Sequence, residues 1–261
     1  MKLRVRFNKL GKIRWISHRD IARCVERAVR RANLPVAYSE GFSPRPRISF
    51  GLALPTGAES LAEYLDIDFA DNEVNLADVG PSLSTGLPVG IDVTATAPLP
   101  GGADSLQESV VSCRWEVGIF SAGHAPLDAE WFADAVNRVT NASELVVTRE
   151  RKGAVVTDDI RPGITALSEG ARPDGTPILI ADLATGVGRS IRPTELGLAL
   201  ELPVARLDVR RTHQWIERDG GRVEPLLETS NECLNLPLTS TSRSPGDAGA
   251  VPVAPALLTA R

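Results

Sequence analysis

The chain has 261 residues, of which 43% are hydrophobic and 24% are charged, and its formal net charge is −4. This composition is typical of one large or two ordinary globular domains. The sequence has no apolar run near ~18 residues and no hydrophobic leader after Met1. We therefore predict a cytoplasmic protein without a membrane segment. Its three cysteines, Cys24, Cys113 and Cys233, stand far apart without a C-x-x-C pair, which argues against disulfides and against a metal or cofactor site built by this chain alone.

The first hundred residues carry alternating strand and helix signals. The segment "KLRVRF" predicts a strand, and "IRWIS" predicts a short extended segment. Ser17 is a good N-cap, so a helix should run from about His18 to Ala32 and stop there, because Pro35 cannot continue it. The rest of this half should form a helix at 75–83 and strands at 35–39, 48–54, 62–69 and 89–97.

A second series of strand and helix signals follows a linker. The segment "PLPGGADS" at 98–105 has two Pro, two Gly and no apolar period. Beyond it, a hairpin is predicted at 144–160, with its turn at Lys152-Gly153. The other predicted elements are helices at 128–139 and 192–202 and strands at 109–119, 176–183 and 206–217.

Both halves therefore follow the order β-α-β-β-α-β, with one added hairpin strand in the first half. This order predicts an α+β fold of two tandem ferredoxin-like (βαββαβ) units with antiparallel sheets. From Thr239 the chain is rich in Ser, Pro, Gly and Ala, which predicts a disordered tail. The predicted boundaries are a basic first domain at 1–100, a linker at 101–106, a second domain at 107–217, and an extension with the tail at 218–261.

The charges are distributed unevenly along the chain. Residues 1–50 hold thirteen Lys/Arg and three Asp/Glu, whereas residues 51–110 hold ten Asp/Glu and no basic residue. Two interpretations are open: the two segments pair with each other inside the fold, or the basic segment binds an external polyanion.

The predicted first helix separates its residues into two faces when they are placed at about 100° per residue. The apolar face consists of Ile21, Val25, Ala28, Val29 and Ala32. The opposite face consists of Arg19, Arg23, Arg27, Arg30 and Arg31. Like charges four residues apart repel each other, and a merely solvated face normally mixes acids with bases. The stripe of arginines therefore favours anion binding over a face that meets the acidic segment.

The loop "GFSPRPR" is a second basic signal. Gly41 permits a positive φ, two prolines stiffen the loop, and Arg45 and Arg47 add guanidinium groups, which bind phosphate in two-pronged fashion. Phe42 is either a core plug under the loop or a surface aromatic on which a base stacks. We predict that helix and loop together form one phosphate-binding surface.

Several long motifs resemble the radical SAM-linked protein family, which is also known as the DUF2344 domain. They are "FNKLGKIRWISHRD", "RAVRRANLPVAYSEGFSPRPRISFGLALPTGAES", "EYLDI", "DDIRPGI" and "SIRPTELGLALEL", and they lie within residues 2–217. The resemblance implies partners more than chemistry, namely a B12-binding radical SAM protein and an E/G-type ribonuclease. Arg45 stands where the resemblance leads us to expect His, which suits anion binding better than catalysis.

An enzymatic function has weaker support in the sequence. The chain has no C-x-x-x-C-x-x-C motif, so it is not itself a radical SAM enzyme. A metal-independent RNA endonuclease could use His18, Tyr38 and Lys12 for acid–base chemistry. We predict instead a non-catalytic module that presents a structured RNA, such as tRNA or rRNA, to a radical SAM or ribonuclease partner. A protein-only adaptor of that partner is a further alternative.

Overall fold

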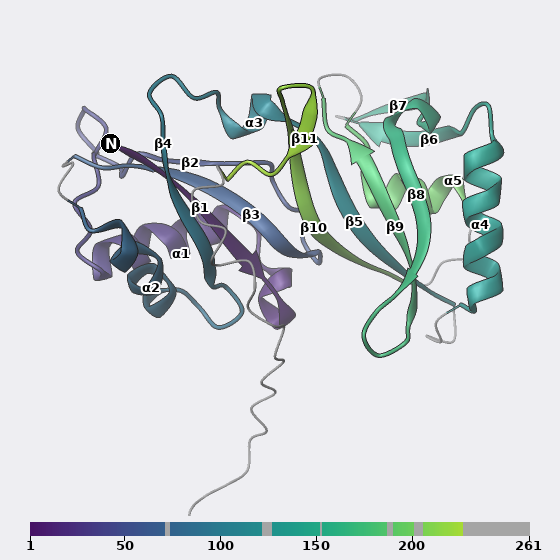
Figure 1. The fold of residues 1–261 in the computed structure, drawn as a ribbon, viewed down its shortest axis with the longest axis horizontal. Coiled ribbons are helices and arrows are strands. Elements are labelled where there is room, and N and C mark those ends of the chain that lie inside the picture. Colours follow the sequence, from purple (N-terminus) through teal and green to yellow (C-terminus); the bar gives the residue numbers. More distant parts are fainter. Residues whose placement is uncertain (71–73, 122–126, 152, 187–189, 201–205, 227–261) are drawn as a thin grey trace, which may run out of the picture.

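A computed structural model describes residues 1–70, 74–121, 127–151, 153–186, 190–200 and 206–226 (Figure 1). The helices are α1 (His18–Arg31), α2 (Leu76–Gly86), α3 (Leu106–Ser109), α4 (Ala129–Asn141) and α5 (Pro193–Ala199), with 3-10 turns η1 (Gly11–Trp15) and η2 (Arg161–Gly163). The strands are β1 (Lys2–Lys9), β2 (Ile48–Phe50), β3 (Glu59–Asp68), β4 (Val93–Leu99), β5 (Val110–Phe120), β6 (Val146–Arg151), β7 (Ala154–Asp159), β8 (Ile164–Ala171), β9 (Pro177–Ala184), β10 (Arg206–Arg218) and β11 (Gly221–Val223). The tail predicted from Thr239 lies outside these residues.

The described part of the chain confirms an α+β fold with a mostly antiparallel sheet. Nine strands form one sheet along the path β4-β1-β3-β10-β5-β9-β8, with β2 paired to β3 and β11 paired to β10, while β6 and β7 form a separate hairpin. The sequence predicted a sheet for each half, but β10 joins them by pairing in parallel with β3 at Arg210↔Glu59 and Arg211↔Ser60. Within the described ranges, no helix is long and apolar enough to cross a membrane.

Some predicted elements differ from the observed ones. The predicted strand at 35–39 is reduced to single bridges, Val36↔Phe69 and Tyr38↔Pro46, because the prolines around it cannot donate to a ladder. The extended segment expected at "IRWIS" is the 3-10 turn η1, which follows Gly11 with φ of 73°. The short or exposed elements α3, η2, β8 and β11 were not predicted.

Two hydrophobic clusters hold the helices against the sheet. In the first half, α1 and α2 pack on β1 and β3, with Val25 and Leu83 buried against Val5 and Leu65. In the second half, α4 and α5 pack on β5 and β9 around Phe132 and other fully buried side chains. Figure 1 shows these pairs of helices at opposite ends of the continuous sheet. The exposed faces of the helices are therefore far apart, and α1 presents its own surface to solvent.

Buried ion pairs connect the acidic segment to strands of both halves. Arg211 of β10 donates to the carboxylate of Glu63 from Nε at 3.0 Å and from Nη2 at 2.6 Å. Arg4 of β1 donates to Asp66 at 2.8 and 3.0 Å, and its Nη1 donates to the carbonyl of Pro225 at 2.9 Å. Part of the charge asymmetry is therefore an internal matching of acids in β3 with arginines in β1 and β10.

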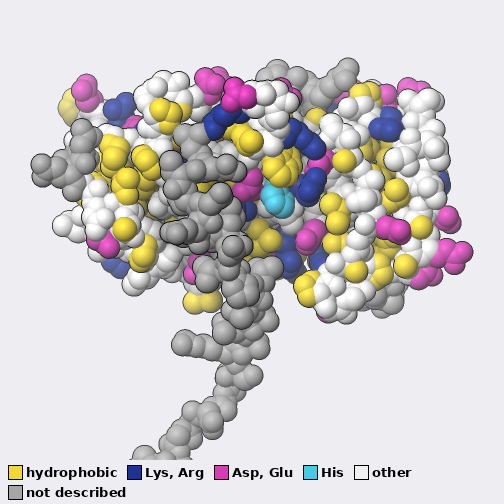
Figure 2. All heavy atoms as spheres, in the orientation of Figure 1, with side chains coloured by type: hydrophobic (Ala, Val, Ile, Leu, Met, Phe, Trp, Pro, Cys, Tyr) yellow, Lys and Arg dark blue, Asp and Glu magenta, His cyan; other side chains and the backbone are white. Residues whose placement is uncertain are grey.

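Arginines and acidic side chains also lie side by side on the face of the sheet shown in Figure 2. Basic and acidic side chains intermingle over β10 and its neighbours in this view. The pairs near the junction of the halves are Arg6–Glu224 at 2.9 Å and Arg210–Glu59 at 2.8 Å. Arg210 and Gly11, whose amide also donates to Glu59, help to keep the pKa of this carboxyl below its usual value despite its burial. Most arginines of this junction have an acidic partner.

Candidate functional site

Helix α1 begins and divides its faces as the sequence predicts. The Ser17 hydroxyl accepts a hydrogen bond from the amide of Asp20 at 3.2 Å and donates one to its carboxylate at 2.7 Å. This second bond is the main reason that the pKa of Asp20 is lowered. The buried residues of the helix are Ile21, Cys24, Val25, Ala28 and Val29. The predicted stripe, Arg19, Arg23, Arg27, Arg30 and Arg31, is exposed.

The arginines of α1 are poorly matched by acids. Arg23 pairs with Asp20 at 3.2 Å and Arg30 pairs with Glu26 at 3.5 Å, both within the helix and both with guanidinium side chains more than half exposed. Among the described residues, none of the five arginines pairs with an acid from residues 51–110. The internal matching that accounts for Arg4 and Arg211 therefore does not extend to α1, and three guanidinium charges of the helix are left without an acidic partner there.

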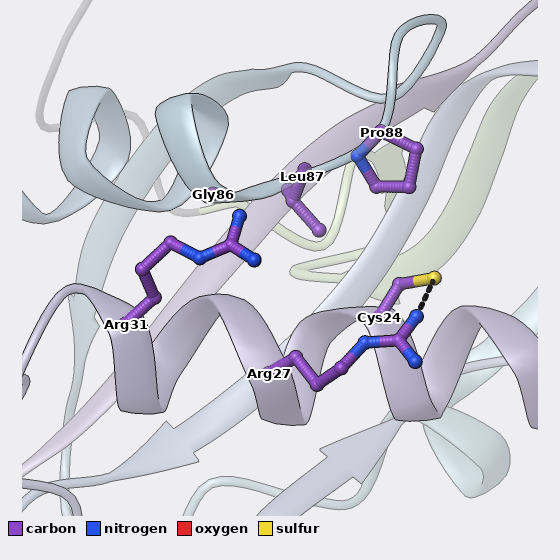
Figure 3. Close-up of a pocket in the computed structure, with 6 residues that line it drawn as sticks. All are labelled: Cys24, Arg27, Arg31, Gly86, Leu87 and Pro88. Carbon is purple, nitrogen blue, oxygen red and sulfur yellow. Dashed lines mark hydrogen bonds between the residues drawn. The ribbon is translucent and has the colours of Figure 1, made fainter.

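An open hollow of about 290 Å³ lies between α1 and the end of α2. Figure 3 shows Arg31 extending toward Gly86 and Arg27 turning along the helix toward Cys24. The Nη2 atom of Arg27 donates to the Cys24 sulfur at 3.2 Å. The residues that line the hollow are Cys24, Arg27, Arg31, Gly86, Leu87 and Pro88. Two guanidinium groups thus line one small concave site, and guanidinium groups bind oxyanions such as phosphate.

A close contact between the two helices sets the width of this hollow. A Cβ atom added at Gly86 would lie 3.0 Å from both the Cα and the Cβ of Ala28, so only glycine fits without moving a helix. Ala28 lies between Arg27 and Arg31 along α1. The contact therefore brings the end of α2 directly beside the two arginines.

The loop at 39–47 projects into solvent from the edge of the first half. Gly41 has a φ of 122°, and the loop is closed by the Ser39 amide, which donates to the Arg45 carbonyl at 2.8 Å. Phe42 is fully exposed, so the interpretation of this side chain as a core plug is wrong. Arg47 lies 3.8 Å from Asp68, whereas Arg45 is exposed and has no ion-pair partner within the described residues.

The described contacts of the loop tie it to β3 and not to the arginines of α1. The loop is tied to the end of β3, where the Asp68 amide donates to the Arg47 carbonyl at 3.0 Å. Within the described ranges, no hydrogen bond or ion pair joins the loop to an arginine of α1. A 14-residue helix is about 21 Å long, and its C-terminal arginines, Arg30 and Arg31, are the nearest to the loop along the chain.

The three residues considered for acid–base catalysis are not joined by any described contact. The His18 ring packs edge-on against Phe50, with centroids 5.3 Å apart. Tyr38 is about half exposed in the bridge that closes the loop, and Lys12 is exposed in η1. Proton transfer needs groups within hydrogen-bond reach of a common reacting atom. In the described part of the chain, no group of three His, Cys, Asp or Glu side chains is placed to hold a metal ion.

Comparison with known families gives a match over most of the chain. Residues 2–193 match the family described as "Uncharacterized protein conserved in bacteria (DUF2344)". The chain belongs to the DUF2344 family. The matched region contains α1, the loop and the hollow, so the whole candidate site of this DUF2344 protein lies within the family domain. No curated protein matches the chain.

Two solved structures show a distant likeness to this DUF2344 chain. A crystal structure of a Cbf5-Nop10-Gar1 complex aligns with a TM-score of 0.42 and 10% identity, over 81% of this chain and 48% of that chain. The chain thus spans about half the length of that protein. A candidate glycine cleavage system transcriptional repressor aligns with a TM-score of 0.24 and 10% identity, over 80% of this chain and 97% of that one. Neither likeness bears on the function of this DUF2344 protein.

The structure adds residues to the site that the sequence of the DUF2344 chain did not indicate. Cys24 and the segment 86–88 line the hollow. The sequence assigned Cys24 to neither face of the first helix and left 86–88 between the helix predicted at 75–83 and the strand predicted at 89–97. Their role depends on the approach of two helices whose lining residues are 55 or more positions apart in sequence. No local pattern could have predicted it.

Proposed function

We propose that this DUF2344 protein is a non-catalytic RNA-binding module that recognises phosphate groups through the arginines of α1. The observation that carries the proposal is the contrast between matched and unmatched arginines. Arg4 and Arg211 are buried against acids, while Arg19, Arg27 and Arg31 are exposed on one helix and lack acidic partners in the described residues. An external polyanion would relieve the repulsion along this helix.

The hollow is the most specific part of the proposed surface. Arg27 and Arg31 reach it from successive turns of α1, and guanidinium groups form charge-assisted hydrogen bonds with phosphate oxygens. The exposed Arg19 and Arg23 lie farther along the same face and would contact neighbouring phosphates of the backbone. The surface would therefore follow an RNA strand rather than bind one isolated anion.

The partners are proposed from the sequence resemblance alone. The motifs shared with radical SAM-linked proteins support a role in which this module presents a structured RNA, such as tRNA or rRNA, to a B12-binding radical SAM protein or to an E/G-type ribonuclease. Such a function would place the protein in the cytoplasm. The chain itself would supply substrate binding, and the partner would supply the chemistry.

We also interpret the sheet as two ferredoxin-like units placed edge to edge. The first half has the strand order β4-β1-β3-β2, and the second half has the order β10-β5-β9-β8, each with two helices packed on it. Both orders agree with a βαββαβ unit, apart from the inserted β6–β7 hairpin in the second. The parallel contact of β3 with β10 would then be the interface between the units.

Crosslinking in cells, followed by sequencing of the bound RNA, tests the proposed function. We expect the wild-type protein to yield a defined set of structured RNAs, and the variant Arg23→Glu/Arg27→Glu to lose most of that yield, because both arginines lie outside the core. Mass spectrometry of the same material would identify a protein partner. Recovery of a radical SAM protein without RNA would contradict the RNA-binding role and favour the protein-only adaptor.

A cleavage assay separates the binding module from the nuclease alternative. We expect purified protein to leave the bound RNA intact in EDTA over hours, and His18→Ala to reduce stability modestly, by about 1 kcal/mol, through loss of the contact with Phe50. The measurement is gel analysis of end-labelled RNA. Metal-independent cleavage that His18→Ala stops while binding persists would show that the protein is a nuclease.

A further inference from the structure

Trp15 is a large apolar side chain that the fold leaves in solvent. It ends η1, two residues before Ser17, the N-cap of α1, and the residue is 64% exposed. By contrast, Trp115 is only 5% exposed and lies within the hydrophobic core. An exposed tryptophan on a well-fixed backbone is a typical feature of binding surfaces, because its ring gives a large contact area with little loss of conformational entropy.

Several polar contacts fix the backbone that carries Trp15. The buried Lys9 donates from Nζ to the carbonyls of Arg14 at 3.1 Å and of Ile16 at 3.0 Å, and burial lowers the pKa of this lysine. The Gly11 amide donates to the Glu59 carboxylate at 2.8 Å. The turn is thus held at both ends by β1 and β3, so the position of the ring is defined before any ligand binds.

The Trp15 ring lies against the backbone of Gly57, which has no side chain. Gly57 has a φ of 89°, and a Cβ atom there would come within 2.8 Å of Cζ3 of Trp15. The Gly57 amide also donates to the Arg14 carbonyl at 2.8 Å, and the Arg14 guanidinium carbon lies 5.2 Å from the ring centroid. The tryptophan is therefore supported on a glycine and accompanied by a cation.

We propose that Trp15 is a stacking platform for an unpaired base of the RNA that α1 binds, an inference that rests on the proposed function. The ring lies at the N-terminal end of the arginine stripe, four residues before Arg19. Arg14 is paired with Glu59 at 3.9 Å and with Asp208 at 4.0 Å, so it adds no free charge. Lys12 and Arg19, on either side of Trp15 in the sequence, are exposed and have no ion-pair partner within the described residues. Phosphates on either side of a stacked base would thus meet positive charge, which favours a nucleic acid over an acidic or apolar protein segment.

The test compares Trp15→Ala and Trp15→Phe with the wild-type protein. The ligands are a single-stranded RNA oligonucleotide and an abasic oligomer of equal length and charge. Stacking on an aromatic ring is worth roughly 1–3 kcal/mol per base, so Trp15→Ala should weaken binding of the oligonucleotide by about five- to 150-fold. Trp15→Phe should retain most of the affinity, and the abasic oligomer should bind all three proteins equally. Melting temperatures of the variants check that they fold.

The outcomes distinguish this inference from the proposed function. Salt-dependent RNA binding that Trp15→Ala leaves unchanged would overturn the stacking role while the phosphate-binding role stands. An equal loss of affinity for the abasic oligomer would also overturn it, because the effect would then not involve a base. Absence of binding at low salt to both oligomers and to a structured RNA would overturn the proposed function itself.

Discussion

Replacing Arg211 by Met should lower the free energy of unfolding by about 3–5 kcal/mol, because it leaves the Glu63 carboxylate buried without a counter-charge. Arg211 is only 2% exposed, and besides Glu63 its guanidinium contacts the carbonyl of Leu52 at 2.9 Å. The pair also connects β10 to β3, where the two halves of the sheet meet. The loss should therefore weaken the junction of the halves as well as the local packing.

Urea denaturation of matched variants would measure this effect. The control Arg30→Met removes an exposed pair with Glu26 and should change the free energy of unfolding by only about 0–1 kcal/mol. The double variant Arg211→Met/Glu63→Leu should recover much of the loss, because it removes the unpaired charge. A single variant Arg211→Met as stable as the control would contradict the assignment of a buried ion pair.

The double variant Arg27→Ala/Arg31→Ala should weaken RNA binding about a hundredfold at constant salt. Both guanidinium groups line the hollow beside Gly86 and would each lose one charge-assisted hydrogen bond with a phosphate, worth about 1.5 kcal/mol or tenfold in affinity. Filter binding or fluorescence anisotropy with a structured RNA would measure the change. The melting temperature should stay close to the wild-type value, because both side chains are exposed.

A second double variant controls for the general loss of positive charge. Arg138→Ala/Arg218→Ala removes two exposed arginines from α4 and from the end of β10, far along the chain from α1. We expect it to reduce affinity less than about threefold, through long-range electrostatics alone. Equal effects of the two double variants would show that the hollow has no specific role.

The faces of α1 could be predicted from the sequence because they depend only on helical periodicity and on local capping. Ser17 begins the helix as expected, and Val25 and Ala28 are buried while the arginines are exposed. The hollow could not be predicted in the same way. It exists because Gly86 lets α2 approach Ala28, and this contact depends on tertiary packing across 58 residues.

The sequence did not predict that β10 joins the two halves of the sheet, for a similar reason. In the strand "RLDVRRTHQWIE", Arg211 continues the alternation of Leu207 and Val209, and in β3 Glu63 shares its face with Leu65. In each strand, a charged residue stands at a position where the alternation predicts an apolar one. This pattern indicates a buried ion pair. The partner of each charge could not be identified, because the pair joins strands that are 148 residues apart.

The salt dependence of RNA binding tests the central claim most directly. Each arginine that contacts a phosphate releases a counterion, so the logarithm of the binding constant should fall with the logarithm of salt concentration with a slope of several units. Removing Arg27 and Arg31 should flatten that slope by about two units, while removing Arg138 and Arg218 should leave it unchanged. Binding without a measurable slope, or the same slope in all three proteins, would contradict a phosphate-binding surface on α1.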